Sequence, residues 1–170
     1  MRRPAHRSYA HETALIEPSV ALEMSGLEIM EAIRDGRLPI AAIAQTIDFR
    51  LVEVEAGRTV FEGEPDRHVH NMFGAAHGGY AATLLDSAMG CAVQTTVPKG
   101  RAYTTVDLTI NYVRPILLGA GTVRAEGKVL HSGRRTATAD GRLVGADGRL
   151  YAHGITTCLI FPVDEMRVSG

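Results

Sequence analysis

One long apolar helix, expected from about residue 79 to residue 96, constrains this chain more than any other feature. Apolar side chains cover most of its circumference between residues 80 and 93, and Pro98 and Gly100 end it. Its polar and small residues recur at steps of three and four, so they form one narrow stripe: Thr83, Asp86, Ser87, Gly90 and Gln94. A helix that is apolar on nearly every side must be covered on nearly every side, so the rest of the chain has to wrap it.

Strand-like patterns flank this helix in the sequence. A two-residue period from residue 47, a turn at Gly57 and a second run at 59–64 predict a hairpin before the helix. Four further runs follow it, at 102–113, 122–131, 135–144 and 150–161. Because no helix alternates with these runs, we expect an antiparallel sheet, with the last four strands in a meander, curled around the single helix.

The length of the chain predicts one domain of the α+β class. We place it at residues 47–162. Residues 1–46 form an N-terminal extension with a short helix, because Ser25 and Glu28 match a capping box ahead of apolar residues at helical spacing. Residues 163–170 remain as a C-terminal tail.

Charge and hydrophobicity exclude several kinds of partner. The formal net charge of -1 provides no basic surface for nucleic acid. No segment approaches the ~20 apolar residues of a membrane-spanning helix, so a membrane is not expected as a partner either. Cys91 and Cys158 lie in apolar surroundings without metal-type spacing, which is typical of reduced thiols in a cytoplasmic protein.

Asp86 is the unusual residue of the apolar helix. A stripe that faces solvent would explain it, but this stripe is narrow, and small residues leave room beside the carboxylate for a ligand. The triplet His77-Gly78-Gly79 precedes the first turn, where backbone N–H groups lack intrahelical partners. Glycines there allow a carbonyl oxygen to approach those donors, which is how an oxyanion hole is built.

Two other chemistries fit the same residues less well. Serine hydrolases of the α/β class also use a His-Gly-Gly segment, yet this chain has no Gly-x-Ser-x-Gly. His68, His70 and His77 are close in the sequence, but no nearby carboxylate or thiolate completes a convincing ligand set. We therefore expect no metal site.

Together these residues resemble the hotdog-fold acyl-CoA thioesterases of the phenylacetic acid degradation (PaaI-like) type. The resemblance rests on Asn71-x-x-Gly74-x-x-His77-Gly78-Gly79, on Asp86 nine positions after the histidine, and on the stretch TTVDLTINYVRP at 104–115. It covers about residues 40–161. It implies a hotdog fold, in which a curled antiparallel sheet wraps a long central helix, and a homodimer or homotetramer with active sites at the subunit interface.

The resemblance also implies roles for single residues. Asp86 would act as general base or nucleophile, and the backbone N–H of Gly78 would form the oxyanion hole. Asn71 would position the attacking water or the thioester, and His77 would support the site by hydrogen bonding.

Two further positions would contact the substrate. One is Gly79, the second glycine of the triplet. The other is a hydroxyl on the strand after the helix, contributed by the facing subunit. Thr105 matches that place, with Thr104 as the alternative.

The implied reaction is the hydrolysis of an acyl-CoA thioester to a free acid and coenzyme A. It needs a polarised carbonyl, an activated water and a thiolate leaving group, so no cofactor is required. The acyl group stays open between aryl, short-chain and medium-chain. A non-catalytic acyl-CoA-binding hotdog module and a hotdog hydratase or dehydratase are the alternatives, and the presence of both Asp86 and the triplet favours the hydrolase.

Overall fold

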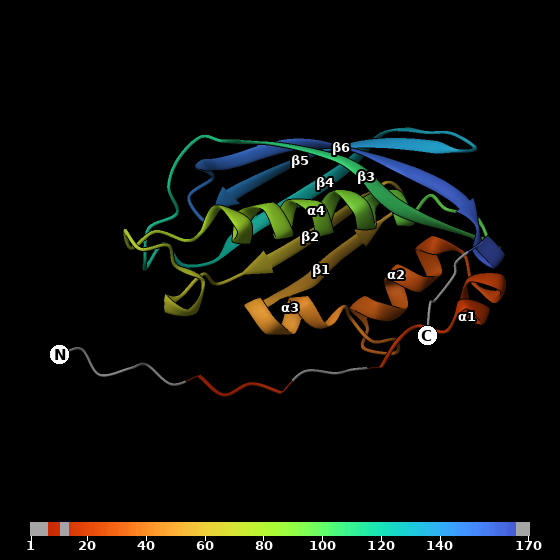
Figure 1. The fold of residues 1–170 in the computed structure, drawn as a ribbon, viewed down its shortest axis with the longest axis horizontal. Helices are drawn as coiled ribbons and strands as arrows, with labels where there is room; N and C mark the ends of the chain where they lie inside the picture. The colour runs from red at the N-terminus through yellow and green to blue at the C-terminus, as the bar shows by residue number, and fades with distance from the viewer. Residues whose placement is uncertain (1–6, 11–13, 166–170) are drawn as a thin grey trace.

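A six-stranded antiparallel sheet curls around one long helix, α4 (Gly78–Gln94), in the computed structural model, which describes residues 7–10 and 14–165 (Figure 1). The strands are β1 (Phe49–Glu55), β2 (Arg58–Gly63), β3 (Arg101–Tyr112), β4 (Val123–Ser132), β5 (Thr136–Gly145) and β6 (Leu150–Pro162). Single turns of 3-10 helix lie at η1 (Arg67–Val69) and η2 (Val163–Glu165). This is the α+β architecture that the sequence pattern predicted.

The strand order is β1-β2-β4-β5-β6-β3. It corrects the expected meander of the last four strands. β4, β5 and β6 do follow one another as antiparallel neighbours, but β3 pairs with β6 and lies at the edge of the sheet. After β3 the chain crosses over through residues 113–122, and β4 then pairs with β2. The crossover thus places β3 at the opposite edge of the sheet from β1, and the sheet between these two edges curls around α4 (Figure 1).

The sheet approaches α4 closely along the buried face of the helix. Leu84, Leu85, Ala88, Met89, Ala92 and Val93 have no exposed surface. The hydroxyl of Thr59 donates to the carbonyl of Ala88 at 2.7 Å. Gly127 on β4 is required nearby, because a Cβ there would lie 2.3 Å from the same carbonyl oxygen. The predicted polar stripe is half-buried at Thr83, Asp86, Ser87 and Gln94, so it is not a solvent-facing surface.

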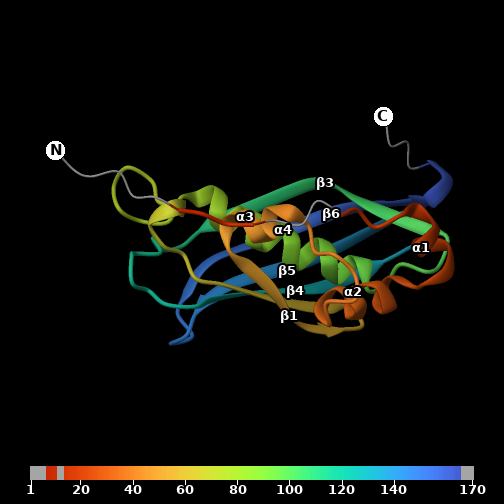
Figure 2. The same ribbon diagram turned by 90° about the horizontal axis from the view of Figure 1, so that it is seen from below.

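Within the described part of the chain, three helices precede β1, where the sequence predicted one: α1 (Pro18–Glu23), α2 (Gly26–Arg34) and α3 (Ala42–Ile47). α2 begins with the expected capping box, in which the backbone N–H of Ser25 donates to the Glu28 carboxylate at 2.7 Å. α1 and α3 have six residues each and no capping side chain, so they leave no clear sequence pattern. α2 packs against β1 and α4, α3 packs against β1, and α1 lies at the far end against α2, η2 and β3 (Figure 2).

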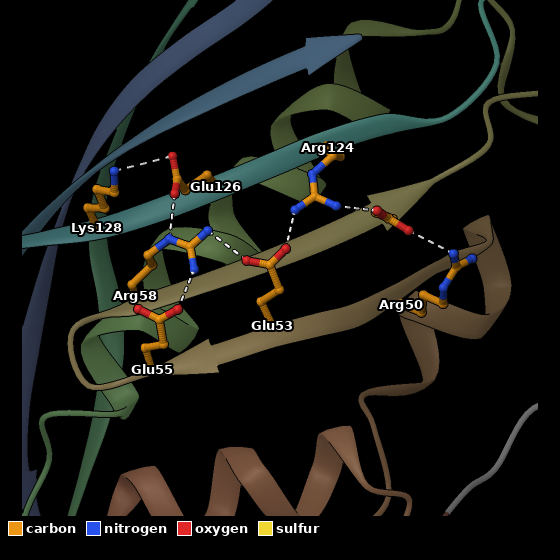
Figure 3. Close-up of polar contacts among 8 residues, drawn as sticks. Arg50, Glu53, Glu55, Arg58, Arg124, Glu126 and Lys128 are labelled. Atoms are coloured by element: carbon orange, nitrogen blue, oxygen red, sulfur yellow. Dashed lines mark hydrogen bonds and ion pairs between the residues drawn. The ribbon is translucent and has the colours of Figure 1, made fainter. Parts of the chain in front are cut away.

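An ion network covers the outer face of β1, β2 and β4, on the side away from α4 (Figure 3). Four carboxylates and four cations alternate across the strands, so their charges cancel: Arg50, Glu53, Glu55, Arg58, Glu62, Arg124, Glu126 and Lys128. Arg58 contacts Glu53 at 2.7 Å and Glu126 at 2.5 Å, and Arg124 bridges Glu53 and Glu62. Val60 points to the same face and is 1% exposed, so the aliphatic parts of the network cover it.

We expect this network to stabilise the fold in a pH-dependent way. Hydrogen bonds from Arg124 and Arg58 hold the pKa of the Glu53 carboxyl below its usual range. A carboxyl whose pKa is lower in the folded state stabilises the fold above its unfolded pKa, and this contribution is lost as the pH falls through the folded value. Because the side chain is 39% exposed, solvent screens the interaction.

Glu53→Gln should therefore lower the free energy of unfolding by about 1 kcal/mol at neutral pH, and by much less at acid pH. Denaturant unfolding of wild type and variant at the two pH values measures the difference. Glu55→Gln is the matched control, because Glu55 contacts Arg58 alone, at 3.0 Å, and is more exposed. An equal loss for Glu53→Gln at both pH values would show that its charge is not what stabilises the sheet.

Candidate active site

The triplet His77-Gly78-Gly79 forms the N-terminus of α4. His77 is the N-cap residue, and its Nδ1 accepts a hydrogen bond from the backbone N–H of Gly79 at 2.9 Å. The donor of Gly79 is therefore occupied. Within residues 7–10 and 14–165, the N–H of Gly78 has no backbone or side-chain acceptor. Gly78 thus carries the available donor of the triplet, and His77 holds the turn that presents it.

Asn71 organises the loop that leads into the triplet. Its Oδ1 accepts hydrogen bonds from the N–H groups of Phe73 at 2.8 Å and Ala75 at 3.3 Å. Gly74 adopts φ +88, a left-handed conformation that favours glycine, and this explains the Asn-x-x-Gly spacing. The carbonyl oxygen of the Asn71 side chain is thus used by the loop itself, which leaves its amide nitrogen for a ligand.

Asn71, His77 and Gly78 line one hollow of about 350 Å³. Tyr112, at the end of β3, lines it too, and its hydroxyl donates to the carbonyl of Gly78 at 3.1 Å. No sequence pattern indicated a role for Tyr112. A β-bulge between Thr105 and Asp107 hides it, because the extra residue moves Tyr112 to the face of β3 that contacts the helix. Alternation counted from Thr105 places Tyr112 on the opposite face.

Asp86 lies two turns further along α4, beneath β3. Its Oδ1 accepts a hydrogen bond from the hydroxyl of Thr105 at 3.1 Å. Thr104 is exposed on the other face of β3, so Thr105 is the hydroxyl beside the carboxylate. The resemblance implied that this hydroxyl comes from the facing subunit, whereas in the structure it belongs to the same chain as Asp86.

The space beyond Asp86 holds a tyrosine and a thiol, Tyr103 and Cys91, which are both half-buried. Burial raises the pKa of the Cys91 thiol to about 12 and raises the pKa of the Tyr103 hydroxyl well above its usual value. Both groups stay protonated at neutral pH, so neither supplies a nucleophile. Gly90 leaves space for the side chain of Tyr103, because a Cβ at position 90 would lie 2.9 Å from the phenolic oxygen.

A single chain does not bring the predicted site residues together. Gly78 and Asp86 are eight positions apart, which is about 12 Å along the helix axis. An oxyanion donor and a base must both lie within about 3 Å of one thioester group. The predicted site residues therefore fall into two separate groups within one chain, which we call half-sites: Asn71, His77 and Gly78 form one, and Asp86 and Thr105 form the other. Both lie along β3, which contacts the first through Tyr112 and the second through Thr105.

Two further observations concern metal ions and membranes. Among the residues that the structure describes, no group of three or more His, Cys, Asp or Glu side chains could hold a metal ion. His77 already uses Nδ1 to cap α4. None of the described helices is long and apolar enough to cross a membrane.

Comparison with known proteins identifies the family. The profile of the thioesterase superfamily matches residues 73–152, a span that includes His77, Gly78, Asp86 and Thr105. Human acyl-coenzyme A thioesterase 13 is 32% identical over 105 residues, which cover 61% of this chain and 74% of the human protein.

Solved structures agree with this match. A phenylacetic acid degradation-related protein of Ralstonia eutropha JMP134 superposes with a TM-score of 0.70 at 25% identity, over 76% of this chain and 98% of that one. A hypothetical thioesterase protein of Streptococcus pneumoniae TIGR4, solved with coenzyme A, has a TM-score of 0.61 at 25% identity, over 68% of this chain and 87% of that one. The chain belongs to the thioesterase superfamily. This confirms the hotdog fold, the PaaI-like resemblance and the enzyme class, a thioester hydrolase.

Proposed function

We propose that this protein hydrolyses acyl-CoA thioesters to a free acid and coenzyme A, in active sites shared between two copies of the chain. The observation that carries the proposal is the separation of the two half-sites along one edge strand. The coenzyme A bound by the Streptococcus pneumoniae relative and the name of the human relative support the substrate class.

The edge strand β3 is suited to pair with a second copy of itself. It has 12 residues, and β6 pairs with it on one side only. Several of its apolar residues are exposed to solvent: the exposed fraction is 59% for Val106, 37% for Leu108 and 57% for Tyr112. Exposed apolar edges of this kind recruit another strand, and identical edges pair about a two-fold axis.

Such an axis would complete the site. Thr105 marks the half-site of Asp86, and Tyr112 marks the half-site of Gly78. A two-fold axis that crosses β3 midway between them, near Leu108, exchanges the two positions. It brings Gly78 of one protomer opposite Asp86 of the partner subunit, so each dimer contains two complete sites.

In the completed site each group has a separate task. The N–H of Gly78 polarises the thioester carbonyl and stabilises the oxyanion of the tetrahedral intermediate. The carboxylate of Asp86 removes a proton from water or attacks the carbonyl carbon itself, and the Thr105 hydroxyl fixes its orientation. Collapse of the intermediate breaks the carbon–sulfur bond and releases coenzyme A as a thiolate.

Release of free thiol from acyl-CoA esters tests the proposed activity. A binding module would leave the thioester intact, and a hydratase would consume the double bond of an enoyl-CoA without releasing thiol. Either of these outcomes would refute hydrolysis as the function.

Subunit complementation tests whether the site is shared. Asp86→Asn and Gly78→Ala should each be nearly inactive alone. When they are mixed and allowed to exchange subunits, half of the dimers are mixed, and each of those has one of its two sites intact. About a quarter of wild-type activity should therefore return. If exchange is verified by mass and no activity returns, Asp86 and Gly78 do not act across the interface.

A further inference from the structure

A second hollow begins at the residue next to Asp86 and runs toward the C-terminal end of α4. Its volume is about 440 Å³. α4 contributes Ser87, Cys91 and Gln94 to its wall, which belong to the half-buried side of the helix that also carries Asp86. From Ser87 to Gln94 the helix axis advances about 10 Å. The hollow is therefore an elongated space whose near end lies at the residue after Asp86, while Asp86 itself is not among the residues that line it.

The walls of this hollow are mainly apolar. Phe49 on β1 and Phe61 on β2 form one side, and Met30 and Ile33 of α2 form another. Arg101 also lines it; its Nη2 donates to the carbonyls of Arg134 and Ile160, and its Nε is buried without a hydrogen-bond partner among the described residues. Apolar clefts of this size are typical of sites that bury a small apolar ligand.

The N-terminal segment builds the wall that faces α4. The lining residues from 14 to 44 all lie outside the span that matches the thioesterase superfamily. α1 closes the end far from Asp86, where the N–H of Gly100 donates to the carbonyl of Ala21 at 2.7 Å and the N–H of Val163 donates to Gly100 at 3.0 Å. Ala21 and Val163 both line the hollow, so its length is limited by this contact between α1, η2 and the start of β3.

We infer that this hollow holds the acyl chain of the substrate, and that α1 at Ala21 limits the chain to a medium-length aliphatic group. The inference rests on the proposed function. The hollow follows the helix for about two turns with mainly apolar walls, so each added methylene gains buried surface until the chain reaches Ala21. An aryl group would fill only the part near Ser87. A long acyl chain would have to displace α1.

Ala21→Phe tests the role of α1 by filling the closed end. The measurement is kcat/KM for butanoyl-, octanoyl-, dodecanoyl-, hexadecanoyl- and phenylacetyl-CoA. Wild type should prefer the octanoyl and dodecanoyl esters. Each methylene that the new ring excludes should lower kcat/KM about fourfold. The kcat/KM for dodecanoyl-CoA should therefore fall about tenfold or more, while that for butanoyl-CoA changes little. Leu22→Phe is the matched control, because Leu22 lies on the same helix, is 59% exposed and does not line the hollow.

The outcomes separate this inference from the proposed function. If the variant displaces α1, hexadecanoyl-CoA should become a better substrate, which also identifies α1 as the limiting wall. Three results would overturn the inference while hydrolysis stands: an unchanged chain-length profile, equal losses with every ester, or a wild-type preference for butanoyl- or phenylacetyl-CoA.

If no ester releases thiol, the proposed function fails. Calorimetric binding of dodecanoate to wild type, Ala21→Phe and Leu22→Phe then decides the assignment of the hollow alone, and equal affinities would refute it.

Discussion

Asp86→Asn should reduce acyl-CoA hydrolysis by about 10²–10⁴-fold, because the amide can neither accept the proton of the attacking water nor act as a nucleophile. Asparagine keeps the shape of the side chain, and its carbonyl oxygen can still accept the hydrogen bond from Thr105, which spans 3.1 Å in the structure. The change therefore removes the chemistry and preserves the packing of α4 beneath β3.

Thiol release from the preferred ester measures this loss, and circular dichroism with size-exclusion chromatography verifies that the variant is folded and assembled. Asp107→Asn is the matched control. Asp107 lies on β3 only two positions after Thr105, but the bulge points it to the face away from α4, so the same substitution there should change turnover little. A well-assembled Asp86→Asn protein with near-normal turnover would exclude Asp86 as the catalytic group.

Gly78→Ala should lower turnover by about 10²–10³-fold, the usual effect of losing one oxyanion donor. A Cβ at this position would lie 3.2 Å from Cζ and 3.3 Å from Oη of Tyr112. The helix start or the tyrosine must shift to accommodate it, and a shift of the helix start would displace the N–H that we propose as the oxyanion donor. Because the φ of Gly78 is not in the left-handed region, alanine adds no backbone strain and the fold should persist.

Binding of a non-hydrolysable acyl-CoA analogue should weaken much less than turnover, since the oxyanion develops only during the reaction. Tyr112→Phe serves as the control. It removes the hydroxyl that donates to the Gly78 carbonyl and leaves the Gly78 N–H in place, so its effect should stay within a few-fold. Equal losses of binding and turnover in Gly78→Ala would mean that Gly78 only shapes the pocket.

The sequence by itself determined the features that depend on neighbours along the chain. The apolar circumference of α4, the capping box at Ser25 and the turn at Gly57 all follow from residues a few positions apart. Gly57 adopts a positive φ, +77, in the turn where the pattern placed it. Helical spacing also showed that Asp86 shares a narrow stripe with small residues, because residues three and four apart lie on one face.

The tertiary structure alone decided which distant segments meet. Alternation along β3 did not reveal that the strand pairs with β6 or that a bulge turns Tyr112 toward Gly78. The His-Gly-Gly motif and Asp86 suggested one site, yet a rigid helix keeps them about 12 Å apart in one chain. α1 and α3 are short and uncapped, so tertiary contacts hold them in place against β1, η2 and the start of β3. Local spacing determines which face a side chain occupies, whereas long-range contacts determine what lies opposite that face.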